Sequence, residues 1–120
     1  MKKILCVDDE PINLMIIEIN LMAEGYEVYK AADGSAAIQM VKEIKPQLVL
    51  LDIMMPGISG IDTLKEIKKI DPDIPVIMVS GVTDEAIAKS ALEFGAYDYV
   101  AKPIDFGYLN TTILIKLLQD

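Results

Sequence analysis

The stretch LVLLDIMMPG, residues 48–57, decides the fold class of this 120-residue chain. It begins with four apolar residues, and an aspartate, Asp52, follows them directly. A second apolar run, VIMV at 76–79, has the same character. A strand that is apolar at every position is covered on both faces, and helices on both faces of a sheet are typical of parallel strands. These two runs therefore predict an α/β domain.

Short β-branched segments alternate with longer segments of helical spacing along the chain. The spacing predicts strands at 3–7, 26–31, 47–51, 75–79 and 97–101, and helices at 12–24, 34–45, 60–70, 84–94 and 104–118. Gly25 is expected just after the first helix, and Thr83 or Asp84 is expected to cap the fourth. Five strands alternating with five helices predict a doubly wound (βα)5 sheet with helices on both faces, formed by residues 1–120 as a single domain.

The composition excludes several classes of function. The net charge is −8 and all 11 basic residues are lysines, so no basic stripe is available for direct nucleic-acid binding. The chain has no histidine, which excludes histidine catalysis and histidine-ligated zinc. The single Cys6 lies in an apolar run and is predicted to pack in the core. We find no signal peptide and no run long enough to insert in a membrane, so we expect a cytoplasmic protein.

Polar and charged residues gather where the predicted strands end. They are Asp8, Asp9 and Glu10 after the first strand, Asp52 after the third, Ser80 after the fourth and Lys102 after the fifth. Open parallel sheets bind ligands at this edge, at the point where the strand order reverses. If the order is 2-1-3-4-5, as in flavodoxin-like sheets, the first and third strands flank that point. Three carboxylates would then meet in one cleft.

Convergent carboxylates without histidine form a site of hard oxygen ligands, which Mg²⁺ prefers. The neighbouring acids Asp8 and Asp9 repel each other, and a bound dication would offset that repulsion. A lysine such as Lys102 suits phosphate, and the Ser80 hydroxyl can donate to a phosphate oxygen. The carboxylate of Asp52 could act as a nucleophile. This set of residues predicts magnesium-dependent handling of a phosphoryl group.

Four motifs, in this order and at this spacing, resemble those of the response-regulator receiver domain, the CheY-like phosphoacceptor module of two-component signalling. The motifs are VDDEP, LLDIMMPGISG, VIMVSG and YDYVAKP, and the resemblance covers essentially all of the chain. It implies the flavodoxin-like order 2-1-3-4-5. It also implies that Asp52 accepts a phosphoryl group from a histidine kinase, a histidine phosphotransfer protein or a small donor. The domain would then be a switch rather than an enzyme.

The resemblance implies a role for each residue near the metal. Asp9 would be the direct ligand of Mg²⁺, or of Mn²⁺ as an alternative, and Asp8 would reach the ion through water. Asp52 and the backbone carbonyl of Met54 would complete the protein ligands. Glu10 is seldom a ligand in this family, and its position beside Pro11 also suits a helix start.

Further roles concern the phosphoryl group. The resemblance implies that Ser80 and Lys102 bind it and that Tyr99 changes rotamer with Ser80 on activation. The bond before Pro103 is expected to be cis. Two variable positions of the family, Met54 and Val82, are apolar here and would obstruct an attacking water. They predict slow self-dephosphorylation.

The resemblance also suggests the partner surfaces. Receiver domains use the first helix to dock on the helical bundle that carries the donor histidine, and in INLMIIEINLMA, residues 12–23, only Glu18 is charged. We expect four residues to contact that bundle: Leu14, Met15, Ile19 and Met22. The face formed by the fourth helix, the fifth strand and the fifth helix would signal to a downstream protein or form a homodimer.

Two other functions are consistent with parts of the pattern. A phosphatase of the haloacid dehalogenase type also uses a strand-end aspartate and Mg²⁺, but it needs a second aspartate where this chain has Met54. A flavodoxin-like flavin carrier would hold a phosphate after the first strand, where Asp8, Asp9 and Glu10 would repel it. We expect a stand-alone regulator or the N-terminal part of a longer one.

Overall fold

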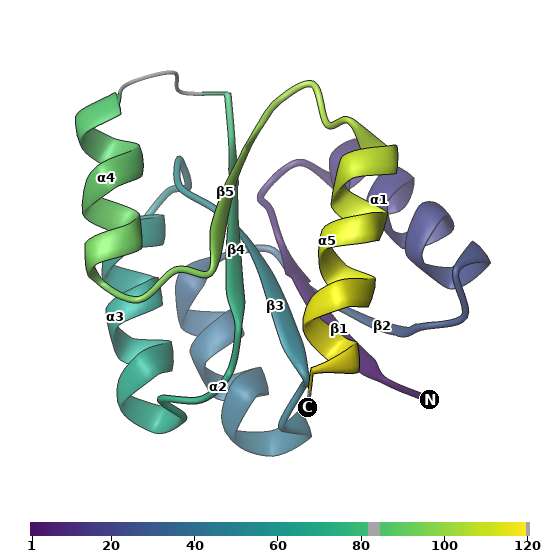
Figure 1. The fold of residues 1–120 in the computed structure, drawn as a ribbon. Coiled ribbons are helices and arrows are strands. Elements are labelled where there is room, and N and C mark those ends of the chain that lie inside the picture. The colour runs from purple at the N-terminus through teal and green to yellow at the C-terminus, as the bar shows by residue number, and fades with distance from the viewer. Residues whose placement is uncertain (82–84, 120) are drawn as a thin grey trace.

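The structure is a computed structural model that describes residues 1–81 and 85–119. Within these residues, five parallel strands form one sheet in the order β2-β1-β3-β4-β5 (Figure 1). The strands are β1 (Lys3–Val7), β2 (Glu27–Ala31), β3 (Leu48–Asp52), β4 (Val76–Ser80) and β5 (Asp98–Ala101). The helices are α1 (Pro11–Ala23), α2 (Gly34–Ile44), α3 (Gly60–Ile70), α4 (Glu85–Glu93) and α5 (Phe106–Leu118). The predicted flavodoxin-like α/β fold is therefore confirmed.

The element boundaries lie within about two residues of those predicted, as is usual for helix and strand ends. Gly25 follows α1 with a φ of 90°, a left-handed conformation that glycine adopts without a steric penalty. Its position as the residue after the helix end is confirmed. The predicted caps of α4, Thr83 and Asp84, lie outside the described residues.

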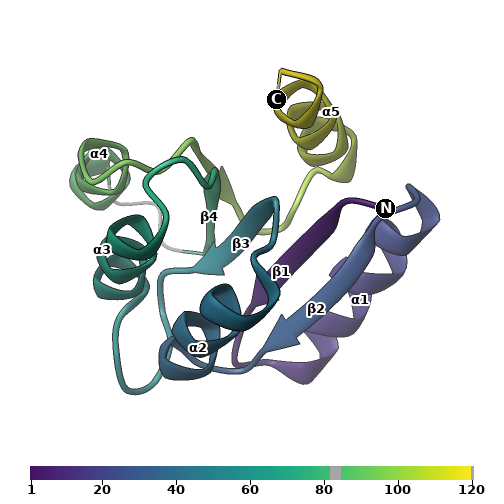
Figure 2. The same ribbon diagram turned by 90° about the horizontal axis from the view of Figure 1, so that it is seen from below.

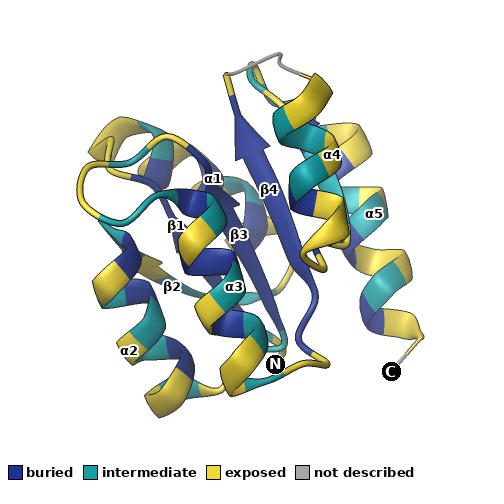
Figure 3. Cartoon of the chain, turned by 90° about the vertical axis from the view of Figure 1, so that its left-hand side faces the viewer, coloured by how far each residue is buried: buried dark blue, intermediate teal, exposed yellow. Residues whose placement is uncertain are grey.

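Two apolar cores lie on opposite faces of the sheet, beneath the two groups of helices that Figure 2 shows on either side of it. One core joins the sheet to α1 and α5 and includes Cys6, which is fully buried as predicted. The other core joins the sheet to α2, α3 and α4. Strands β3 and β4 are buried at every position, because helices cover both of their faces (Figure 3).

Side-chain caps fix where three helices begin. Asp33 accepts a hydrogen bond from the Ala36 N–H at 2.8 Å, and Ser59 accepts one from the Asp62 N–H at 3.1 Å. Asp105 does the same for α5, at 3.1 Å from the Tyr108 nitrogen. These caps satisfy N–H groups that have no partner within the helix. The caps therefore define the first residues of α2, α3 and α5 after the strands that precede them.

Helix α1 corrects one prediction about the partner surface. Leu14 is only 8% exposed and packs in the core with Ile17 and Leu21, because residues 14, 17 and 21 share one face of the helix. Three of the expected surface residues, Met15, Ile19 and Met22, are indeed exposed. Sequence analysis missed two more exposed apolar residues on the same helix, Ile12 and Ile16. No helix among the described residues is long and apolar enough to span a membrane.

Candidate functional site

Three carboxylates meet at the carboxyl edge of the sheet. Asp8 follows β1 and Asp52 ends β3, and these strands are neighbours with Val7 paired to Leu51. Asp9 comes next in the chain, and a carboxylate oxygen from each of the three aspartates lies within 4.8 Å of the others. The convergence predicted for the first and third strands is therefore present.

Lys102 links the two buried carboxylates. Its Nζ donates to Asp8 Oδ2 at 2.9 Å and to Asp52 Oδ2 at 3.1 Å. Its backbone N–H donates to the Ser80 carbonyl at 2.8 Å, which continues the pairing of β4 with β5 past the end of β5. Sequence analysis expects this lysine to contact a phosphate. The structure shows that it also forms ion pairs with two acids.

The backbone satisfies the other oxygen of each buried acid. The Glu10 N–H donates to Asp8 Oδ1 at 2.9 Å, and the Met54 N–H donates to Asp52 Oδ1 at 3.1 Å. Asp8 and Asp52 are buried, whereas Asp9 is exposed. A buried carboxylate is tolerated only when its oxygens are hydrogen-bonded or paired with a cation, and both conditions hold for Asp8 and Asp52.

Burial and hydrogen bonding act in opposite directions on the pKa values of Asp52 and Lys102. Burial raises the pKa of Asp52, and the hydrogen bonds from Lys102 and from the Met54 N–H only partly offset that effect. Burial also acts to lower the pKa of Lys102, but its hydrogen bonds to Asp8 and Asp52 outweigh burial, so its pKa is raised. The lysine is therefore firmly cationic, and the Asp52 carboxylate is more basic than that of an ordinary aspartate.

The remaining predicted residues lie on the strands and loops of the same edge. Ser80 is buried as the last residue of β4, and Tyr99 is half-buried on β5 against the core beneath α2, α3 and α4. The Met54 side chain is exposed beside the site. Glu10 precedes Pro11 at the start of α1, as expected, and its side chain makes no capping hydrogen bond. Val82 lies outside the described residues.

Gly60 has a structural role that sequence analysis does not explain. A Cβ atom at this position would lie 2.3 Å from the Asp52 carbonyl oxygen and 2.4 Å from the Ile53 Cα. The Gly60 N–H donates to the Ile53 carbonyl at 2.9 Å. Only glycine lets α3 start this close to the end of β3, and this contact holds the loop that carries Met54.

An apolar pocket beside Lys102 is a further feature that sequence analysis missed. Its volume is about 240 Å³, and it lies between α1 and the loop after β5. The lining residues are Asn13, Ile16, Ile17, Lys102, Pro103, Ile104 and Phe106. The Lys102–Pro103 bond in this loop is cis, as expected. The apolar residues that follow Lys102 in the sequence are the signal that could have indicated such a pocket.

The chain matches the family model of the response regulator receiver domain over residues 4–114. A CheY-like response regulator receiver domain protein from Methanospirillum hungatei has a similar solved structure, with a TM-score of 0.95 and 32% identity, covering 99% of this chain and 95% of that one. NtrX from Brucella abortus gives a TM-score of 0.91 and 36% identity, covering 99% of this chain but 27% of that protein. The chemotaxis protein CheY4 of Vibrio cholerae gives a TM-score of 0.89 and 26% identity, covering 95% of this chain and 97% of that one.

Proposed function

This chain belongs to the response regulator receiver domain family, and on that premise we propose that it is a phosphoacceptor switch of two-component signalling, with Asp52 as the acceptor. One observation carries the proposal. Asp52 ends a buried central strand, and its two oxygens are held by Lys102 and by the Met54 N–H, with Asp8 and Asp9 beside it. This arrangement orients a carboxylate nucleophile next to a cation and a candidate metal site.

The acidic cluster fits a divalent cation. Its donors are carboxylate oxygens within 4.8 Å of one another, and no nitrogen or sulfur ligand is among them. Asp9, Asp52 and the Met54 carbonyl would hold Mg²⁺ directly, with Asp8 reaching it through water, and Mn²⁺ could take the same place. When bound, the ion would neutralise charge on the phosphoryl oxygens.

The chemistry assigned to the protein's own residues is a single displacement. An Asp52 carboxylate oxygen attacks the phosphorus of the donor, the bond from phosphorus to the donor breaks, and the donor group leaves with the bonding electron pair. Lys102 would then exchange its contact with the Asp52 carboxylate for one with a phosphoryl oxygen, and the Ser80 hydroxyl would donate to another. Tyr99 would follow Ser80 and transmit the change.

The partners we propose are those expected from the sequence, with one correction. A histidine kinase or a histidine phosphotransfer protein would dock on α1 through Met15, Ile19 and Met22, and not through the buried Leu14. The face of α4, β5 and α5 would signal to a downstream protein or form a homodimer, as part of a stand-alone or longer regulator in the cytoplasm. The domain acts as a switch and not as an enzyme, and we propose no direct contact with nucleic acid.

The experiment that tests this function uses a small donor. The purified protein is mixed with acetyl phosphate or phosphoramidate and Mg²⁺, and its intact mass is measured. We expect a gain of one phosphoryl group, no gain for Asp52→Asn, and an unchanged gain for the matched control Asp62→Asn on the exposed surface of α3. An unmodified wild-type protein would contradict the proposal.

The lifetime of the phosphorylated protein tests the expectation about its neighbours. The exposed Met54 side chain lies beside the site and presents no polar group to guide water. We therefore expect slow hydrolysis, and a polar substitution such as Met54→Asn should shorten the lifetime. Loss of the phosphoryl group from the wild type within seconds would contradict this expectation.

A further inference from the structure

The outer surfaces of α1 and α5 are covered by large apolar side chains. Each of them is between 46% and 73% exposed. They are Ile12, Met15, Ile16, Ile19 and Met22 on α1, with Leu114 and Leu118 on α5. We call this set the α1–α5 face. The two helices lie on the same side of the sheet (Figure 2).

A pair of amides joins the two helices at this face. Asn20 of α1 donates to Asn110 Oδ1 at 2.7 Å, and Asn110 of α5 donates back to Asn20 Oδ1 at 3.1 Å. On α5, Leu114 comes one helical turn after Asn110, and on α1, Ile16 comes one turn before Asn20. Apolar side chains of both helices therefore flank the amide pair.

The seven side chains of the α1–α5 face are all uncharged. Glu18 is the only charged residue of α1, and its side chain turns to β2, where Lys30 donates to it at 3.0 Å. Lys116 is the only charged residue of α5, and its Nζ lies over the Tyr97 ring, 5.1 Å from the centroid. Both charged side chains of these helices are thus engaged beside the face rather than on it.

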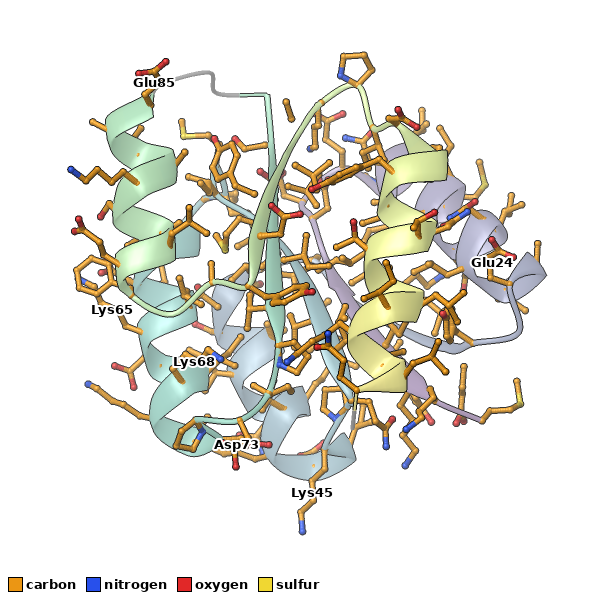
Figure 4. All side chains as sticks on the ribbon, viewed as in Figure 1. Glu24, Lys45, Lys65, Lys68, Asp73 and Glu85 are labelled. Atoms are coloured by element: carbon orange, nitrogen blue, oxygen red, sulfur yellow. The ribbon has the colours of Figure 1, made fainter. Side chains whose placement is uncertain are left out.

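Helix α3, on the other side of the sheet, is different. Exposed residues of α3 include Asp62, Glu66 and Lys69, and Figure 4 shows Lys65 and Lys68 on the same helix. The outer surface of α3 therefore carries charges of both signs. The outer surface of α1 and α5 is apolar instead, and an exposed apolar patch of this kind marks a binding surface.

The size of the face is that of one side of a stable interface. At roughly 100 Å² of exposed surface for each half-exposed Leu, Ile or Met, seven side chains provide on the order of 700 Å², and a standard interface buries about 800 Å² on each partner. The largest apolar patch of an ordinary monomer is about 300–600 Å². The α1–α5 face is at or above the upper end of that range.

We propose that the α1–α5 face binds a second copy of this chain in a two-fold dimer that forms without phosphorylation. A basic partner would be attracted to the acids of the chain, and the seven side chains of this face include none. An uncharged apolar surface matches a surface of the same kind, and a two-fold axis brings two copies of this one together.

Docking of the phosphodonor does not account for the whole face. Helix α1 has 13 residues and is therefore about 20 Å long. Ile12 lies at the end near Asp8, whereas Met22 and Leu118 lie in the last turns of their helices, away from the site. A second copy would cover both ends. Because it would also cover Met15, dimerisation and donor docking should exclude each other.

Sedimentation velocity of the purified protein in chelator, from about 1 µM to about 1 mM, tests the dimer. We expect a concentration-dependent monomer–dimer equilibrium, unchanged in Asp52→Asn. Ile19→Glu and Leu118→Glu should each raise the dimer dissociation constant at least about tenfold. The matched control is Leu92→Glu on α4, where the leucine is 49% exposed, and it should leave the constant unchanged.

Two outcomes would overturn the proposal. One is a protein that stays monomeric over the whole concentration range. The other is a dimer that Leu92→Glu dissociates and Leu118→Glu does not, which would place the interface on α4. Circular dichroism and phosphorylation by acetyl phosphate confirm that each variant is folded. Since the dimer is tested without a phosphoryl group, its failure would leave the proposed role of Asp52 intact.

Discussion

The body of the sheet and its carboxyl edge can be compared through two pairs of residues. One pair is Cys6 and Asp8, and the other is Leu50 and Asp52. Within each pair the residues are two positions apart, and all four are no more than 5% exposed. Burial, together with the charge of Glu18, raises the pKa of the Cys6 thiol to about 12, so it stays neutral. Asp8 and Asp52 instead pair with Lys102. The difference teaches that burial is tolerated for a charge only where the chain supplies a partner.

The largest expected effect comes from moving a carboxylate from the edge into the body of the sheet. Leu50→Asp would bury an acid two residues before Asp52, among the apolar side chains of α1 and α5. We expect a loss of more than about 4 kcal/mol and an unfolded domain at neutral pH. Urea denaturation measures this. Leu50→Met is the control and should cost less than about 1.5 kcal/mol. A stably folded Leu50→Asp would contradict the comparison.

A dication should stabilise the edge and leave the body of the sheet unaffected. At a Mg²⁺ concentration one hundred times its dissociation constant, we expect the free energy of unfolding to rise by about 2.7 kcal/mol. Asp9→Asn should reduce this gain and, by removing like-charge repulsion, raise the stability of the metal-free protein. Thermal unfolding with and without chelator measures both effects. A melting temperature that does not respond to Mg²⁺ would count against the metal site.

Removing the Lys102 ammonium group tests how much its pairing with Asp8 and Asp52 stabilises the fold. Lys102→Met would leave two buried carboxylates with only their backbone donors, and we expect a loss of about 2 kcal/mol in metal-free buffer. Saturating Mg²⁺ should recover part of this loss. The control is Lys69→Met on the exposed end of α3, which should change stability by less than about 0.5 kcal/mol. Equal stability of Lys102→Met and the wild type would show that the pairing is unimportant.

The smallest effect is in the pH dependence. The pKa of Asp52 is raised mainly by burial, so its ionisation in the folded protein opposes folding. This penalty is absent below about 3.8, the pKa of Asp52 in the unfolded chain. It develops as the pH rises above that value and is complete above the pKa of Asp52 in the folded protein. In chelator, Asp52→Asn should therefore gain stability relative to the wild type as the pH rises to neutral. If the advantage of Asp52→Asn in free energy of unfolding shrinks as the pH rises, the raised pKa of Asp52 is contradicted.

Much of the site could be predicted because the edge of a parallel sheet can be read from the chain. Asp52 follows four apolar residues, and Ser80 and Lys102 follow similar runs, so their places at strand ends depend on local sequence alone. Parallel strands bring all of their carboxyl ends to one edge, whatever their exact order. To predict that the acids converge, only one more fact is needed: β1 and β3 are neighbours in the sheet.

Other features depend on contacts between distant segments. Leu14 and Met15 are adjacent apolar residues, and only the packing of α1 on the sheet decides that one is buried and the other exposed. Gly60 is required by its distance to the Asp52 carbonyl, which no local pattern expresses. Leu114 and Leu118 extend the face of α1 only because Asn110 of α5 meets Asn20.

The sequence alone determined the class of fold, the strand ends and the residues delivered to them, because hydrophobic periodicity and strand direction are properties of neighbouring residues. The tertiary structure decided what those residues do to one another. Lys102 holds Asp8 across 94 positions of the chain, and that contact pairs a buried carboxylate with a cation. Electrostatic and packing energies depend on distances between atoms, and only the folded chain fixes those distances.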